Sequence, residues 1–83
     1  MKVMVRYFAS IREAIGQGSE AVETSATTLG ALRDELIARG GAHASSLARG
    51  RAVRMALNQT LSDESATLVE GAEVAFFPPV TGG

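Results

Sequence analysis

The chain has 83 residues, of which 46% are hydrophobic, and a formal net charge of −1 at pH 7. This length suits a single domain, the hydrophobic content argues against disorder, and the near-neutral charge gives no field that favours nucleic acid or an anionic membrane. The absence of cysteine excludes disulfides and thiolate metal sites, and no segment has the apolar length of a signal peptide or transmembrane helix, so we expect a cytoplasmic protein without a metal site.

The first part of the chain predicts two strands around a short helix. Residues 2–8 alternate between two faces and are rich in β-branched and aromatic side chains, which is typical of a strand. Ser10 is placed to cap a helix over residues 11–15, and two nearby glycines end it. Residues 20–24 are then expected to form a second strand, related to the first as in a hairpin.

The main helix is predicted after Thr28, which is a suitable N-cap. Arg39 falls in its expected last turn, where a cation suits the helix dipole, and Gly40 and Gly41 supply a left-handed stop. Gly30 is unfavourable inside a helix, so we expect close packing at that position. One apolar stripe at helical spacing supports the assignment: Leu29, Leu32, Leu36 and Ile37.

The rest of the chain predicts three further strands. Residues 42–50 are small and polar, and we expect about one helical turn there. Residues 53–57 alternate again and end at a turn, Leu61 begins a short fourth strand, and residues 73–77 form the last one.

This order of elements predicts an α+β fold of the ubiquitin-like β-grasp type. It has a mixed sheet of four to five strands with one main helix packed on one face, and the first and last strands lie parallel and adjacent in the centre. Residues 1–77 form the domain, and residues 78–83 form an extended C-terminal tail.

The tail follows from the residues after the last strand, Pro78-Pro79-Val80-Thr81-Gly82-Gly83. Proline has no N–H for a sheet ladder and fixes φ, so the strand must end and the tail should project. At about 3.1 Å per residue it reaches roughly 15–20 Å. Such a tail can thread a channel in another protein and deliver the carboxylate of its last glycine.

Three segments carry a resemblance to a known family. Residues 71–83 (GAEVAFFPPVTGG) resemble the C-terminal signature of the small subunit of molybdopterin synthase, in the MoaD/ThiS group of sulfur carriers. Residues 56–61 (ALNQTL) are similar to a second segment of these proteins, and residues 8–13 (FASIRE) to their first strand-to-helix junction.

The resemblance implies a two-stage chemistry at Gly83, with Gly82 beside it. A ubiquitin-activating-type adenylyltransferase consumes ATP to adenylate Gly83, and a sulfur donor protein converts it into a thiocarboxylate. The sulfur then passes to precursor Z (cyclic pyranopterin monophosphate) to form the molybdopterin dithiolene of the molybdenum cofactor. Catalytic residues are expected in the large subunit of a heterotetramer, so this chain would be a sulfur-donating subunit with no bound cofactor.

The alternation of the strands also predicts a partner-binding face. It leaves Phe8, Leu61 and Phe77 on the face opposite the helix, where they would form an exposed apolar patch rather than core. The family's partner surface falls at matching positions. Arg12 follows the first strand near this patch, and two interpretations of it stay open: a partner-binding residue that pairs with a carboxylate, or a solvated helix residue. The tail residues Pro78, Pro79, Val80 and Thr81 are also expected to contact partners. The core side should hold Val3, Val5, Tyr7, Val74 and Phe76.

Other candidates have plainer interpretations. Arg49, Arg51 and Arg54 form a basic cluster that we expect to be solvated, and His43 is expected to be a surface residue without metal partners. Three other functions stay open: a carrier for thiazole or another sulfur pathway, a ubiquitin-like protein modifier, and a β-grasp binding module with an inert tail. The single lysine, Lys2, argues weakly against chain building by a modifier.

Overall fold

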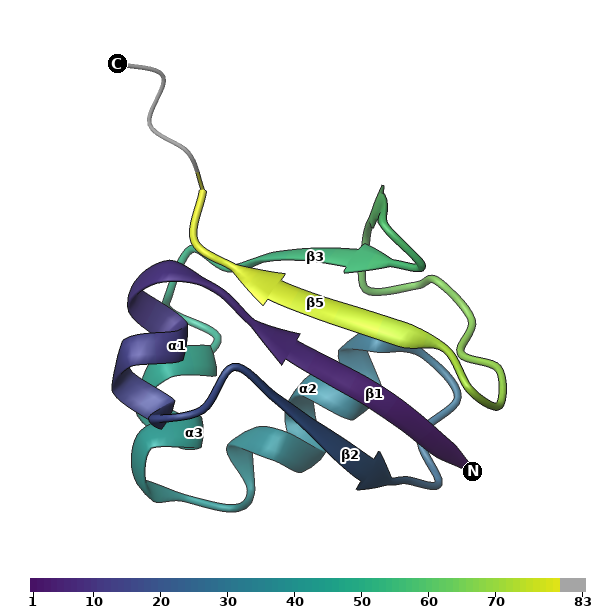
Figure 1. Ribbon diagram of the computed structural model, residues 1–83, viewed down its shortest axis with the longest axis horizontal. Helices are drawn as coiled ribbons and strands as arrows, with labels where there is room; N and C mark the ends of the chain where they lie inside the picture. The colour runs from purple at the N-terminus through teal and green to yellow at the C-terminus, as the bar shows by residue number, and fades with distance from the viewer. Residues whose placement is uncertain (80–83) are drawn as a thin grey trace.

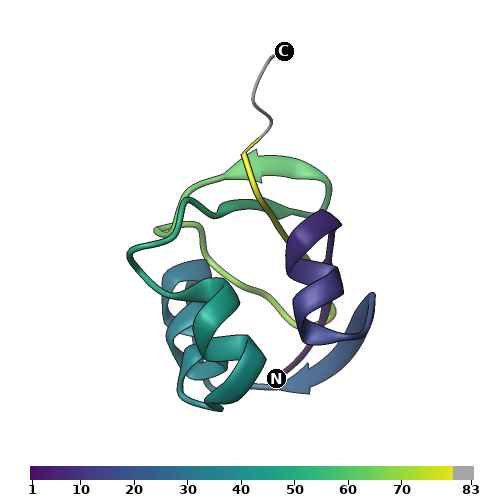
Figure 2. The ribbon, with the colours of Figure 1, turned by 90° about the vertical axis from the view of Figure 1, so that its left-hand side faces the viewer.

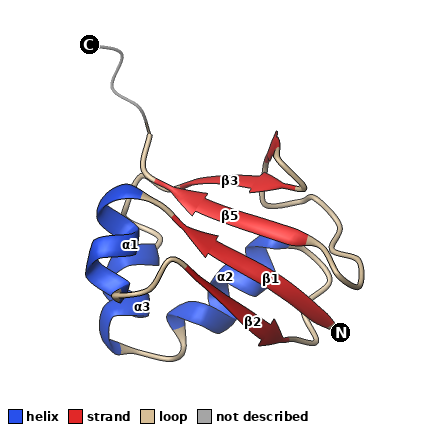
Figure 3. Ribbon diagram, in the orientation of Figure 1, coloured by secondary structure: helices blue, strands red, loops and turns tan. Residues whose placement is uncertain are grey.

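The computed structural model describes residues 1–79 as a mixed five-stranded sheet with three helices (Figures 1 and 3). The strands are β1 (Lys2–Tyr7), β2 (Ser19–Glu23), β3 (Arg54–Leu57), β4 (Thr60–Ser62) and β5 (Glu73–Phe77). Their order is β2-β1-β5-β3-β4, in which β1 and β5 are parallel and the other pairs antiparallel. The predicted α+β β-grasp fold, with the first and last strands adjacent in the centre, is therefore confirmed.

The hydrophobic core lies on one face of the sheet, as the alternation predicted. Helix α2 (Leu29–Ile37) crosses this face, while α1 (Ala9–Ile15) and α3 (Gly41–Leu47) lie at the end where β1 and β5 end (Figure 1). The side chains assigned to the core side are at most 1% exposed: Val3, Val5, Tyr7, Val74 and Phe76. No helix within residues 1–79 is long and apolar enough to cross a membrane.

Helix α1 begins earlier than predicted, and Ser10 is not its cap. Phe8 stays extended as the N-cap residue, and its carbonyl oxygen accepts hydrogen bonds from the N–H groups of Ile11 and Arg12, both at 3.2 Å. Ser10 therefore lies inside the first turn, and no side chain caps the helix. Gly16 adopts the left-handed conformation at the C-cap, as expected.

The predicted beginning of α2 is confirmed. Thr28 Oγ1 accepts a hydrogen bond from the N–H of Ala31 at 3.2 Å. The close packing expected at Gly30 is also present, because a Cβ there would lie 2.9 Å from Oε1 and 3.0 Å from Cβ of Glu64. The dipole role expected of Arg39 is wrong, since the helix ends at Ile37 and Arg39 instead pairs with Glu20.

Residues 41–47 form a full helix, α3, where only about one turn was expected. Gly40 and Gly41 have φ of 77° and 56°, and this left-handed pair separates α3 from α2. The buried side chain of Arg33, on α2, donates to the carbonyl oxygens of Leu47 and Ala48, both at 2.8 Å. Because these carbonyls have no partner within the helix, Arg33 acts as a C-terminal cap supplied from another element.

Candidate functional site

The site is centred on the end of β5, the middle strand of the sheet. β5 pairs with β1 on one side and β3 on the other, and its last residue, Phe77, lies opposite Arg54 of β3. Pro78 and Pro79, called here the tail root, follow directly and are half-buried. Since neither proline can donate to a ladder, the strand ends where the sequence predicted. Figure 2 shows this end of the molecule, with α1 and α3 below the point where the chain leaves β5.

The described residues end at the tail root. Val80, Thr81, Gly82 and Gly83 lie outside them. The roles predicted for these four residues therefore stay predictions.

The apolar patch expected on the open face of the sheet is present. Phe8 is 39% exposed and Leu61 is 63% exposed, while Phe77 is half-buried at the end of β5. Leu61 lies opposite Ala56, and Ala56 lies opposite Ala75 on β5. We call Phe8, Leu61 and Phe77, with the two alanines between them, the open-face patch.

The alanine side chains at the centre of the open-face patch are short, so they extend less far from the sheet than the larger apolar side chains around them. A partner can therefore bring its backbone or a large side chain close to the sheet between the larger apolar residues. Two arginines border the patch. The guanidinium carbon of Arg6 lies 5.4 Å from the Phe8 ring centroid and its Nη1 lies 3.7 Å from Glu73 Oε2, while Arg54 lies opposite Phe77. This geometry suits an interface, and the partner-binding role itself stays a prediction.

Sequence reasoning missed one exposed apolar residue of this face. Met4 of β1 is 42% exposed and lies opposite Ala21 of β2 and Glu73 of β5. The signal was available, because Met4 alternates with the core residues Val3 and Val5 and so must point away from the helices.

Arg12 lies on the exposed side of α1. A Cβ on Gly18 would come within 3.3 Å of its Nε, so the Arg12 side chain runs along the loop between α1 and β2. It makes no ion pair with any of residues 1–79. The charge is therefore available to a partner, as the sequence analysis allowed.

The basic cluster divides into two kinds of residue. Arg49 is not simply solvated as predicted: its Nη2 lies 2.9 Å from Asp34 Oδ1, and its Nη1 donates to Glu64. The hydrogen bonds from Arg49 to these carboxylates raise its pKa. Arg51 and Arg54 are exposed and have no carboxylate partner within the described residues.

His43 is part of a polar network rather than a simple surface residue. Its Nε2 lies 3.0 Å from Glu20 Oε2, which also accepts a hydrogen bond from the buried Tyr7 hydroxyl at 2.7 Å. Arg39 donates to the other oxygen of Glu20 at 2.7 Å. The network joins β1 and β2 to the segment around α3, and it is a structural feature of the core side.

The network shifts the pKa values of the Glu20 carboxyl and the Tyr7 hydroxyl in opposite directions. Burial opposes ionisation of Glu20, but hydrogen bonds from Arg39, His43 and Tyr7 outweigh it and lower the pKa of this carboxyl to about 2. Burial, together with the hydrogen bond to Glu20, raises the pKa of the Tyr7 hydroxyl. Tyr7 is therefore a neutral donor to a carboxylate that is ionised at neutral pH.

A central C-terminal strand, parallel to the first strand and continued by two prolines beside an exposed apolar face, defines a ubiquitin-like β-grasp protein. Solved structures show the same fold. Small archaeal modifier protein 1 of Haloferax volcanii superposes with a TM-score of 0.76 at 22% identity, over 95% of this chain and 98% of that one.

The comparison of sequences is more specific. The chain belongs to the ThiS family, which matches residues 5–83. It is 41% identical over 81 residues to the molybdopterin synthase sulfur carrier subunit of Escherichia coli K12, covering 98% of this chain and 99% of that protein. In structure it also resembles a chain of the complex of subunits 1 and 2 of molybdopterin-converting factor from Helicobacter pylori, with a TM-score of 0.70, 28% identity and complete coverage of both chains. The predicted resemblance is confirmed.

Proposed function

We propose that this chain is the sulfur carrier subunit of a molybdopterin synthase. The observation that carries the proposal is the position of β5, which ends beside the open-face patch and continues into the tail root. A protein that docks on this patch is thereby aligned with the residues that follow Pro79. The identity with the Escherichia coli sulfur carrier subunit over nearly the whole of both chains supports the same function.

The chemistry resides in the carboxylate of Gly83. A C-terminal carboxylate has a pKa near about 3.5, so it is anionic at neutral pH and a poor electrophile. A ubiquitin-activating-type adenylyltransferase attaches it to the α-phosphate of ATP, which releases pyrophosphate. Sulfide-level sulfur supplied by a donor protein then attacks the carbonyl carbon of Gly83, AMP leaves, and Gly83 carries a thiocarboxylate. Gly82 and Gly83 lack a Cβ, so their backbone can approach a nucleotide closely.

Two loaded carriers each donate one sulfur to precursor Z to form the dithiolene, and each carrier leaves with Gly83 again as a carboxylate. This step takes place on the large subunit, which supplies the catalytic residues. The carrier and the large subunit form a heterotetramer, which acts in the cytoplasm. The structure of the Helicobacter pylori complex supports a large-subunit partner. ATP is used by the activating partner, and the carrier itself holds no cofactor.

Intact mass spectrometry tests the proposal. The full chain is incubated with the activating enzyme, ATP and a sulfur donor, and its mass should rise by the difference between one sulfur and one oxygen atom. A chain lacking Gly83 is the matched control and should show no change. The loaded chain should then convert precursor Z when the large subunit is added.

Three results would contradict the proposal. One is an unchanged mass under conditions that load a known carrier. The second is the appearance, in cells, of higher-mass conjugates that depend on Gly83, which would indicate a protein modifier instead. The third is loading without conversion of precursor Z, together with rescue of a thiazole-deficient strain, which would assign the carrier to another sulfur pathway.

A further inference from the structure

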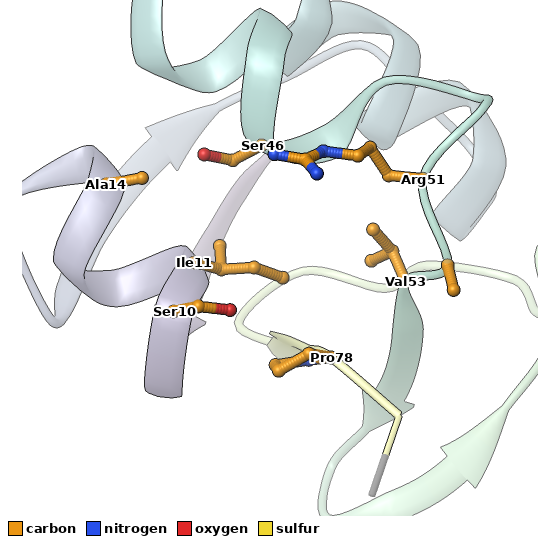
Figure 4. Close-up of a pocket in the computed structure, with 8 residues that line it drawn as sticks. Ser10, Ile11, Ala14, Ser46, Arg51, Val53 and Pro78 are labelled. Atoms are coloured by element: carbon orange, nitrogen blue, oxygen red, sulfur yellow. The ribbon is translucent and has the colours of Figure 1, made fainter. Parts of the chain in front are cut away.

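A pocket of about 360 Å³ lies beside the tail root, between α1, α3 and the segment that leads into β3 (Figure 4). Ile11 and Ala14 of α1, together with Val53 and Pro78, give it apolar walls. The pocket is separate from the open-face patch, although Pro78, which lines it, directly follows Phe77 of that patch.

The polar side of the pocket is cationic. Arg51 Nε donates to the Ser45 carbonyl oxygen at 3.1 Å, which holds the side chain along α3. Figure 4 shows the guanidinium extending over the pocket toward Ser46. Ser10 and Ser46 contribute hydroxyl groups, and no aspartate or glutamate is among the described residues that line the pocket.

We propose that this pocket is a second contact point for the protein that takes up the tail, and that it receives an aspartate or glutamate side chain of that protein. The carboxylate is held by Arg51, and apolar neighbours of the carboxylate pack on Ile11, Val53 and Pro78. This inference rests on the proposed function, in which the carrier delivers the thiocarboxylate of Gly83 to the large synthase subunit.

The enclosure of the tail is the first physical argument. The sequence predicts that the tail threads a channel, and a channel that extends as far as the tail root meets Pro78, which forms part of the pocket wall. We expect a protein bound there to cover the pocket and to remove water from Arg51, which lines it as well. A covered guanidinium without an anionic partner is costly, whereas a carboxylate can accept two parallel hydrogen bonds from its terminal nitrogens.

The availability of Arg51 is the second argument. Arg33 and Arg49 already bind Glu64, Arg39 binds Glu20, and Arg6 lies near Glu73. Arg51 has no such ion pair within residues 1–79, although its Nε is fixed by Ser45. The side chain is therefore positioned by the fold, while its terminal nitrogens and its charge are left for a partner.

Titration of the full chain with purified large subunit tests this inference. Arg51→Gln removes the cation, and Lys2→Gln removes the same charge at the far end of β1. Ala14→Leu fills the pocket without altering Arg51, and Ala14→Ser is its small-residue control. Thermal unfolding of each variant shows that it is folded, which matters because Arg51 also holds the Ser45 carbonyl.

We expect Arg51→Gln and Ala14→Leu each to weaken binding by about 10-fold or more, and the effect of Arg51→Gln to shrink at high salt. Lys2→Gln and Ala14→Ser should stay within about 2-fold of wild type. If wild type binds and Arg51→Gln binds like Lys2→Gln, the pocket proposal is overturned while the carrier function stands. If wild type itself neither binds the large subunit nor acquires sulfur, both proposals fail.

Discussion

Glu20 shows how a single carboxylate fixes several elements at once. It accepts hydrogen bonds from Tyr7 and Arg39 and contacts His43, so it connects the sheet to the helices near the tail end of the molecule. The Tyr7 side chain is 1% exposed, and its hydroxyl needs a partner because an unpaired buried hydroxyl is costly. Glu20 therefore stabilises a core residue and also holds the side chains of Arg39 and His43.

Replacing Glu20 by glutamine tests this account. Glutamine keeps the size of the side chain but loses the charge, so the free energy of unfolding at pH 7 should fall by about 1–3 kcal/mol. Urea unfolding followed by circular dichroism measures the change. Glu13→Gln, on the exposed side of α1, is the matched control and should stay within about 0.5 kcal/mol of wild type.

The stability difference between wild type and Glu20→Gln should depend on pH. The folded-state pKa of Glu20 lies below its ordinary value of 4.5, so its contribution to stability is present above 4.5 and is lost as the pH falls through about 2. The difference in the free energy of unfolding between wild type and Glu20→Gln should therefore become smaller as the pH falls from 4.5 to about 2. A difference of equal size at pH 7 and at the acid end would contradict the assigned cause.

Polar pairs between distant residues were the part of the structure that the sequence could not supply. The alternation of β1 placed Tyr7 in the core, but nothing in the pattern says that Glu20 and His43 meet its hydroxyl. Arg33 was missed for the same reason, since its position on α2 gives no sign that the carbonyls of another helix lie beside it. Such partners depend on tertiary packing.

At the scale of elements, α3 depends on α2 through Arg33. The Arg33 side chain donates to the carbonyls of Leu47 and Ala48, and its Nη1 lies 3.2 Å from Glu64. The sequence of residues 42–50 is a poor helix by itself, which explains why only about one turn was predicted. The extra turn forms because its last carbonyls have a donor from α2.

Removal of this donor should loosen α3. Arg33→Met keeps the side-chain length but removes the side-chain donor to the two carbonyls and one of the two arginines that pair with Glu64, and we expect a loss of about 2–4 kcal/mol in the free energy of unfolding. Arg33→Lys keeps the charge but lacks the fork, so it should lose less, about 1–2 kcal/mol. Hydrogen exchange of the α3 amides should rise in both variants. Unchanged exchange with full stability in Arg33→Met would refute the capping role.

Two glycines give a matched test of packing against backbone freedom. Alanine at Gly30 is a better helix former by about 1 kcal/mol, but its Cβ would approach Cβ of Glu64 to 3.0 Å and the Glu64 carbonyl oxygen to 3.3 Å. We expect the contact to prevail, so Gly30→Ala should be destabilising by about 1–2 kcal/mol. Gly50→Ala meets nothing within 4 Å and should be neutral or slightly stabilising.

Chemical denaturation of the two alanine variants shows whether each substitution raises or lowers the free energy of unfolding. Both replacements add the same methyl group, so the difference between them reports the contact with Glu64 together with the helix-forming gain of about 1 kcal/mol that applies only at Gly30. If Gly30→Ala were more stable than wild type by the full helix-forming gain of about 1 kcal/mol, the close packing against Glu64 would carry no energetic weight.

For the molecule as a whole, the two faces of the sheet followed directly from the sequence. A strand side chain must point to one face or the other, so assigning Val5 and Phe76 to the core left Phe8 and Phe77 on the other side. Topology needed the additional knowledge that one helix covers one face. The pocket beside the tail root could not be predicted, because α3 and the segment after it form one side of it, and the sequence pattern there is weak.

A substitution in the open-face patch should weaken partner binding without changing the stability of the domain. Leu61 is 63% exposed, so Leu61→Glu should change the free energy of unfolding by no more than about 0.5 kcal/mol. In a complex, the same substitution places a charge in an apolar contact, and binding to the large subunit should weaken by at least about 10-fold. Val69, which is 56% exposed in the loop before β5, offers the matched control Val69→Glu.

Calorimetric titration of both variants with the large subunit, beside urea unfolding of each, measures the two quantities. Because Val69 lies at the end of the sheet away from the tail root, Val69→Glu should bind as wild type does. Equal weakening by both substitutions would indicate a general effect of charge rather than contact at the patch. Unaltered binding of Leu61→Glu would remove Leu61 from the interface and leave the tail root and Arg51 as the main points of attachment.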